Sequence, residues 1–182
     1  MRNIKKMLAL VMVIALCVAM TGCMSNARGA AAAQPAVLEV SAAPAEGEET
    51  VLEKNPDEYS DDIQGLCKFM EDNKVTAGER IQMEYGVIGA MNGYKYSYTY
   101  DGSAVQLEVY EFAAEDLSET AQKIVDSVKT SGKFELLDNV IPAQLSADGR
   151  FMLIYTDEKA AKKENNIAHK EHVVACFEAF TA

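Results

Sequence analysis

The chain has 182 residues and a formal net charge of −11, with 28 acidic and 17 basic residues. An acidic surface repels nucleic acid and anionic lipid headgroups, so neither is expected as a partner. The part after residue 59 is long enough for one compact domain and too short for two.

The first 22 residues have the layout of an export signal. Arg2, Lys5 and Lys6 form a positive start, and an apolar run without charge or proline follows from residue 7 to residue 20. This run of 14 residues is shorter than the roughly 20 residues that a membrane-spanning helix needs. It therefore predicts a cleaved secretion signal rather than a permanent membrane span.

Small residues and a cysteine end this signal, in the order Met20-Thr21-Gly22-Cys23. The sequence resembles the lipobox of bacterial lipoproteins, in which a second-type signal peptidase cuts before a lipid-modified cysteine. The resemblance covers only the signal and Cys23. It implies a signal peptide at residues 1–22, cleavage between Gly22 and Cys23, and a diacylglyceryl group on the Cys23 thiol. A lipid anchor of this kind would hold the protein on the extracytoplasmic face of the cell membrane.

Two other processing routes are open. Cys17 follows the bulky Leu16, where the lipobox pattern has a small side chain. A first-type peptidase that cuts after Ala31 or Ala33 would release a soluble protein, but both residues lie far beyond the apolar run. Cys23 is therefore the predicted attachment site.

A linker is predicted from residue 23 to residue 59. Alanine and glutamate dominate it, three of the four prolines fall in it, and it holds few aromatic or branched side chains. Such a segment buries too little apolar surface to offset the entropy lost on ordering. We expect a disordered acidic tether, in which the run from Val37 to Val40 either orders locally or pairs with a sheet edge.

The domain is predicted to span residues 60–182 and to begin with two helices. Ser60 and the two aspartates after it form a helix start, with a capping hydroxyl and acidic groups at the positive end of the helix dipole. Apolar residues then repeat at helical spacing, at Ile63, Leu66, Cys67 and Met70. A second helix is expected from the capping-box sequence at residues 76–79 to a stop at Asn92-Gly93, although its interior glycines would allow part of it to be strand.

The clearest local pattern is a β-hairpin. Tyrosines alternate with polar residues from Tyr94 to Tyr100, Asp101-Gly102 is a two-residue turn signal, and a second strand follows from Ser103 to Phe112. The turn fixes which residues face each other across the two strands. The expected pairs are Tyr98 with Val105, Tyr96 with Leu107 and Tyr94 with Val109 on an apolar face, and Lys95 with Glu108 and Ser97 with Gln106 on the other.

A helix, a second hairpin and a last helix are expected after this hairpin. Asp116 with Glu119 caps the first helix and Gly132 closes it. Its apolar stripe is Leu117, Ala121, Ile124, Val125 and Val128. The second hairpin runs from about Phe134 through a turn at Asp148-Gly149 to Thr156.

The end of this hairpin and the last helix are both predicted to be buried. Residues 151–155 are apolar at consecutive positions, which indicates a strand covered on both faces. Pro142 places the partner strand toward a sheet edge. The last helix carries an apolar side formed by Val173, Cys176, Phe177 and Phe180. The sequence as a whole predicts an α+β domain with helices packed on an antiparallel sheet built from two hairpins, in the order α-α-β-β-α-β-β-α.

The candidate site residues other than Cys23 are few. His169 and His172 are three apart on the last helix and could reach one metal ion, but without a third ligand we interpret them as part of a solvated helix face. The tyrosines are assigned to the core, with Tyr100 the one nearest solvent. Cys67 and Cys176 either form a disulfide, which export permits, or are two buried thiols.

No catalytic, metal or cofactor motif was found. The chain lacks a Gly-x-Ser-x-Gly elbow, a His-Glu-x-x-His sequence, a phosphate loop, a dinucleotide fingerprint and a calcium loop. A triad of Ser103, His169 and an aspartate is conceivable, although turn chemistry explains Ser103. The acidic residues at Asp57, Glu58, Asp61 and Asp62 are explained by helix-start electrostatics. We therefore expect no cofactor, no metal and no catalytic residue.

These features predict a cell-surface lipoprotein whose domain is a non-catalytic binding module. Its partner would be an envelope protein, a peptide or a small ligand. The alternatives are an envelope hydrolase and a structural or inhibitory accessory subunit of a membrane complex. A pocket with convergent titratable groups would favour the enzyme, whereas an apolar groove or an open sheet edge would favour the binding module.

Overall fold

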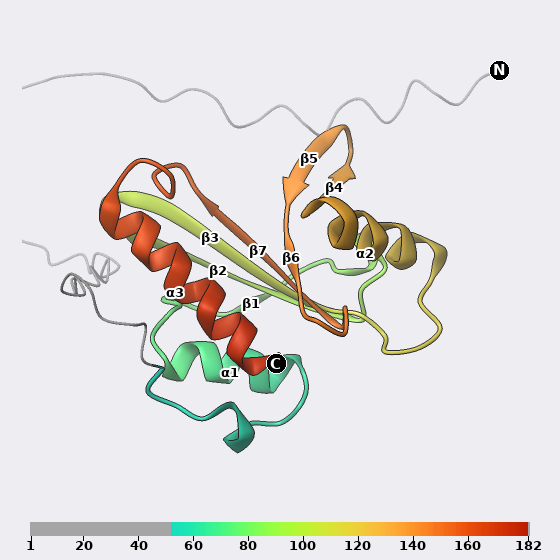
Figure 1. Ribbon diagram of the computed structural model, residues 1–182, viewed down its shortest axis with the longest axis horizontal. Helices are drawn as coiled ribbons and strands as arrows, with labels where there is room; N and C mark the ends of the chain where they lie inside the picture. Colours follow the sequence, from blue (N-terminus) through green and yellow to red (C-terminus); the bar gives the residue numbers. More distant parts are fainter. Residues whose placement is uncertain (1–51, 182) are drawn as a thin grey trace, which may run out of the picture. The chain divides into compact units, whose positions relative to one another are not determined.

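The computed structural model describes residues 52–181 of the chain. The predicted signal peptide, the predicted lipid-attachment site Cys23 and most of the predicted tether lie outside the described residues. In chain order (Figure 1), the elements are η1 (Pro56–Glu58), α1 (Ile63–Asp72), β1 (Ile81–Gln82), η2 (Gly86–Ile88), β2 (Asn92–Tyr100), β3 (Ser103–Glu111), α2 (Glu119–Ser131), β4 (Lys133–Leu136), β5 (Asn139–Pro142), β6 (Gln144–Leu145), β7 (Phe151–Asp157) and α3 (Glu164–Phe180).

The domain is α+β, as predicted, and its main sheet has the order β1-β2-β3-β7-β6 with every neighbouring pair antiparallel. The hairpin of β2 and β3 has the predicted register, with Tyr98 opposite Val105 and Tyr96 opposite Leu107. Asp101 and Gly102 both have positive φ, at 41° and 69°, as the tight turn between paired strands requires.

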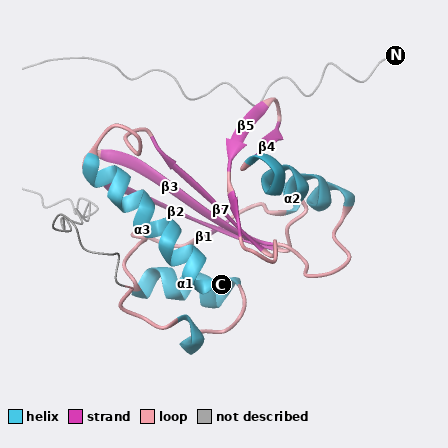
Figure 2. Cartoon of the chain, in the orientation of Figure 1, coloured by secondary structure: helices cyan, strands magenta, loops and turns pink. Residues whose placement is uncertain are grey.

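The two faces of the sheet belong to two separate apolar clusters. Phe151 and Leu153 of β7 pack with α1 and α3, whereas Met152 and Ile154 pack with α2 and the β4–β5 hairpin. All four are buried, so the prediction that this strand is covered on both faces is confirmed. Figure 2 shows α1 and α3 side by side and apart from α2.

Residues 76–91 do not form the predicted second helix. This segment instead contains the short strand β1 and the 3-10 turn η2, which ends at Gly89 with a φ of 74°. Its backbone is bonded to the sheet: Met83 N–H donates to the Gly93 carbonyl and Met91 N–H donates to the Glu111 carbonyl. Pairing with the sheet edge therefore replaces the internal bonds of a helix, and the interior glycines permit it.

The predicted second hairpin is in fact two hairpins. β4 pairs with β5 around a turn at Leu137 and Asp138, both with positive φ, and forms a separate two-stranded sheet. The second of these hairpins joins β7 to the two-residue strand β6, across the predicted Asp148-Gly149 turn. The observed order therefore has three α-helices within residues 52–181, against the four that were expected.

The helix caps differ in detail from the prediction. Asp62, not Ser60, caps α1, because its carboxylate accepts from the Gly65 N–H at 2.8 Å. Ser118, not Asp116, caps α2. Gly132 ends α2 with a φ of 67°, as predicted, and the apolar stripes of both helices are buried apart from the partly exposed Leu117.

Residues 52–59 belong to the domain rather than to the tether. Leu52 and Tyr59 pack against the cluster between the sheet, α1 and α3, and Tyr59 Oη donates to the Asp72 carboxylate at 2.9 Å. The Tyr59 ring meets Phe69 edge-on, with 5.3 Å between ring centroids. The predicted linker boundary at residue 59 is therefore too late, because one tyrosine and one leucine give this segment enough apolar contact to order.

Candidate functional site

A group of polar and titratable side chains lies between the inner side of α3 and the turn end of the β2–β3 hairpin. We call it the His169 cluster, and its members are Tyr98, Tyr100, Ser103, Tyr155, Asp157, Asn166, His169 and His172. His169 is only 7% exposed, so the prediction that it lies on a solvated helix face is wrong. It stacks on Tyr100 at 4.0 Å between ring centroids, with the ring planes 12° apart.

Burial sets the protonation state of this histidine. His169 Nε2 lies 2.9 Å from Tyr98 Oη, and the rings of Tyr98 and Tyr155 meet the imidazole edge-on. Desolvation, with a smaller contribution from the charge of His172, lowers the pKa of His169 to about 4. Burial also raises the pKa of Tyr98 well above its usual range. Both side chains are therefore neutral at pH 7.

On the other side of the cluster, the Asp157 carboxylate accepts several hydrogen bonds. It accepts from the Ser103 hydroxyl, from Asn166 Nδ2 at 2.9 Å and from the Lys159 N–H at 2.8 Å. Burial alone would raise the pKa of Asp157, but these bonds outweigh burial and lower it. The carboxylate therefore ties the hairpin turn, the end of β7 and the first turn of α3 together.

The cluster does not assemble the triad that the sequence left conceivable. The Ser103 hydroxyl donates to Asp157, whereas His169 lies against Tyr98, and no hydrogen bond joins Ser103 to His169 among residues 52–181. Ser103 is itself buried. No group of three metal-ligating side chains forms a metal site in the described part of the chain. What the arrangement does chemically is hold α3 on the sheet.

Two polar atoms of α3 are left without a partner in this region. Asn166 is fully buried and donates to the Tyr100 carbonyl and to Asp157, but its Oδ1 accepts nothing within the described residues, and the same holds for His172 Nε2. Water is the usual partner of such buried atoms.

The alternating tyrosines of β2, from Tyr94 to Tyr100, pack as expected except at the Tyr100 end. Tyr96 is buried and donates from its Oη to the Glu71 carboxylate at 2.8 Å, while Tyr94 and Tyr98 are partly buried. Tyr100, predicted to be nearest solvent, is only 9% exposed because His169 covers its ring. No pattern in the sequence indicates this contact, since the two residues lie in distant segments.

Cys67 and Cys176 are free thiols, both fully buried in the cluster between the sheet, α1 and α3. Desolvation raises the pKa of Cys176 to about 12 and also raises the pKa of Cys67, although Tyr96 and Arg80 act in the opposite direction on Cys67. Protonated, enclosed thiols are poor nucleophiles. The structure thus holds the two residues as separate thiols, and thiol labelling of the unfolded chain distinguishes this state from the disulfide that export permits.

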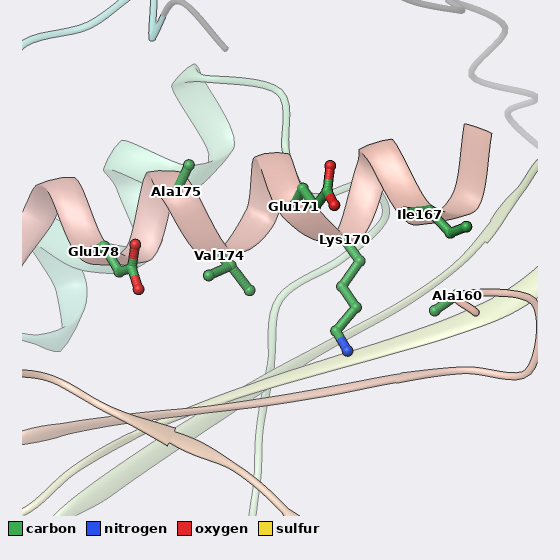
Figure 3. Close-up of a pocket in the computed structure, with 7 residues that line it drawn as sticks. All are labelled: Ala160, Ile167, Lys170, Glu171, Val174, Ala175 and Glu178. Carbon is green, nitrogen blue, oxygen red and sulfur yellow. The ribbon is translucent and has the colours of Figure 1, made fainter. Parts of the chain in front are cut away.

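An open surface lies on the outer side of the same helix α3. A shallow hollow of about 320 Å³ runs along it, and Figure 3 shows its lining side chains on α3, with Ala160 on the turn before the helix. Ile167 at the start of this side is 37% exposed. We call this surface the α3 flank, and its residues are Ala160, Ile167, Lys170, Glu171, Val174, Ala175 and Glu178. Ile167 and Val174 lie off the predicted apolar stripe, which was the signal available in the sequence.

Next to the α3 flank, part of the edge of β7 has no strand paired with it. β6 pairs only with Met152 and Leu153, and β5 before it (Figure 1) contacts β7 but pairs with β4 instead. Ser146 N–H donates to the Phe151 carbonyl, so the Phe151 backbone points away from β3. Backbone groups alternate along a strand, so those of Tyr155 also point away from β3, and no described residue pairs with them there. Gln144 Nε2 donates to Glu178 at 2.6 Å, which places β6 beside the C-terminal half of α3.

Comparison of the chain with protein-family models, with curated proteins and with solved structures found no match. Between residues 52 and 181, no helix combines the length and the apolar character needed to cross a bilayer.

Proposed function

We propose that this protein is a lipoprotein anchored through Cys23 on the extracytoplasmic face of the cell membrane, and that its domain is a non-catalytic interaction module. The anchor is supported by the lipobox-like sequence at residues 20–23. The acidic tether behind it would hold the domain away from the lipid surface.

The observation that carries the binding role is the unpaired edge of β7 beside the α3 flank. An open strand edge offers backbone hydrogen bonds to an added segment, and neighbouring apolar side chains supply pockets for its residues. In the His169 cluster, by contrast, the histidine and the serine of the conceivable triad are both buried, and Ser103 is bonded to Asp157 within the chain. This contrast favours a binding module over the envelope hydrolase that is the alternative.

Affinity capture with the full-length lipoprotein tests the binding role. The wild type, Val174→Glu on the flank and Thr120→Glu on the exposed side of α2 would be recovered from envelopes of the producing cell, with the two variants carrying the same added charge. We expect a partner that the wild type and Thr120→Glu retain and that Val174→Glu loses at least tenfold. Equal retention by all three proteins, or by none, would contradict the proposed binding role.

The anchor has its own test. Cys23→Ser removes the thiol that would carry the lipid, so we expect the full-length variant to lose incorporation of labelled fatty acid and to stay uncleaved. Normal processing of Cys23→Ser would transfer the cleavage site to the alanine run at Ala31 to Ala33.

A further inference from the structure

The α3 flank carries two opposite charges placed symmetrically about one apolar residue. Lys170, Val174 and Glu178, all labelled in Figure 3, follow one another at intervals of four residues along the α3 flank. The two charged residues are exposed, and Val174 between them is partly buried. Residues four apart in a helix lie on the same side, one turn above the other. The stripe therefore presents a positive charge, an apolar centre and a negative charge in a line.

These two charges cannot meet within one chain. Eight residues of α-helix separate Lys170 from Glu178 by about 12 Å. Neither residue forms an ion pair with any other among residues 52–181, in contrast to Lys163 at the helix start, which reaches Asp101. Glu178 accepts one neutral hydrogen bond, from Gln144.

A twofold axis through Val174 would satisfy both charges at once. An antiparallel copy of α3 on this axis places Lys170 of each chain opposite Glu178 of the other, and brings the two Val174 side chains together at the centre. The same face is used by both copies, which is the closed arrangement that a symmetric dimer needs. The reciprocal pairs would fix the direction of the helices more than they add affinity.

We infer that the α3 flank docks a second copy of this chain, with the two α3 helices antiparallel and Val174 on the twofold axis. This inference rests on the proposed function and names the partner of that surface. The chain has a net charge of −11 before its basic signal is removed, so two copies repel each other and the contact is weak in dilute solution. Confinement of anchored chains to one membrane raises their effective concentration and offsets this repulsion.

Disulfide trapping in the cell envelope tests the dimer with the full-length chain. Val174→Cys would put two thiols face to face on the axis, whereas Thr120→Cys on α2 gives a more exposed control thiol away from it. After mild oxidation we expect a covalent dimer on a non-reducing gel for Val174→Cys, at least tenfold more abundant than for Thr120→Cys. Equal yields from the two positions would mean random collision and would overturn the inference.

Charge reversal then tests the pairing itself. In the Val174→Cys background, Lys170→Glu alone or Glu178→Lys alone brings like charges together, so we expect either change to reduce the dimer at least fivefold. The two changes together restore opposite charges across the axis, and we expect them to recover the dimer. Loss without recovery in the double variant would overturn the antiparallel arrangement.

The outcome separates this inference from the proposed function. If Val174→Cys gives no dimer while Val174→Glu still loses an envelope partner, the flank binds another protein and the inference about a second copy fails alone. If neither experiment shows a loss, the proposed binding role of this surface fails as well.

Discussion

The two sides of α3 contain similar types of residue, apolar and titratable, but differ in their exposure to solvent. Its inner side holds Asn166, His169 and Phe177, all buried against the sheet, and its outer side holds Ile167, Lys170 and Val174, which line an open hollow. Titratable groups occur on both sides, but inside they are neutral or bonded within the chain, whereas outside they remain available. A high density of polar groups alone is therefore a poor guide to a binding site, because solvent access decides which groups can contact a partner.

The largest expected difference between the two sides concerns stability. Phe177 is fully buried in the apolar cluster formed by α1, α3 and the sheet. Phe177→Ala would leave a cavity, and such changes cost about 3–5 kcal/mol of unfolding free energy. Chemical denaturation measures the loss, with Lys170→Ala on the exposed side of the same helix as the control. A loss below about 1 kcal/mol for Phe177→Ala would mean that the inner side is not the packed one.

The next prediction concerns the pH dependence of the His169 cluster. The pKa of His169 is about 4 in the folded protein, below its ordinary value of 6.5, so the unfolded chain takes up the proton at a higher pH. The contribution of the neutral histidine to the free energy of unfolding is therefore fully present above pH 6.5. It is lost as the pH falls toward 4, by a total on the order of 3 kcal/mol. His172 adds in the same direction, because burial lowers its pKa too.

His169→Gln isolates the contribution of this residue. The other groups that face the imidazole are Tyr98, Tyr100 and Tyr155, which stay neutral in this range, and Asp157, whose lowered pKa puts its own loss of stability at more acidic pH. We expect the unfolding free energy of the variant to depend less steeply on pH between 4 and 6.5. Parallel curves for the variant and the wild type would contradict a buried neutral histidine.

Local patterns predicted the parts of the fold that local chemistry determines. The Asp101-Gly102 turn and the alternating tyrosines fixed the register of the β2–β3 hairpin, because a two-residue turn leaves no freedom in pairing. The region from Thr76 to Met91 failed for the opposite reason. Its helical spacing is weak, and backbone bonds to the sheet edge, which depend on distant residues, decided its structure.

The candidate site was less predictable than the fold. His169 and Tyr100 lie in different elements, and nothing in the spacing of either indicates that their rings stack. The α3 flank had a visible signal in Ile167 and Val174, yet whether an off-stripe apolar residue is covered depends on which strand lies beside it. Here β6 is too short to cover it.

The third prediction concerns Cys67 and Cys176, both on the inner side of the domain. Burial keeps both thiols protonated and out of reach of solvent, so we expect no labelling of the native mature protein by a maleimide. After unfolding in denaturant without reductant, both should be labelled, as mass spectrometry would show. A mature chain that stays unlabelled after unfolding would establish the disulfide that export permits.

The smallest expected effect on stability belongs to the outer side. Lys170→Ala removes a charge that has no ion-pair partner within the described residues, so its unfolding free energy should change by less than about 0.5 kcal/mol, as is usual for surface substitutions. The same substitution removes one half of each reciprocal pair across the proposed twofold axis, so trapping through Val174→Cys should fall severalfold. For one set of variants, unfolding therefore reports on the packing of the inner side of α3, and trapping reports on contacts made by the flank. A stability loss at Lys170 as large as that of Phe177→Ala would show that the flank is part of the core, and the contrast between the two sides would disappear.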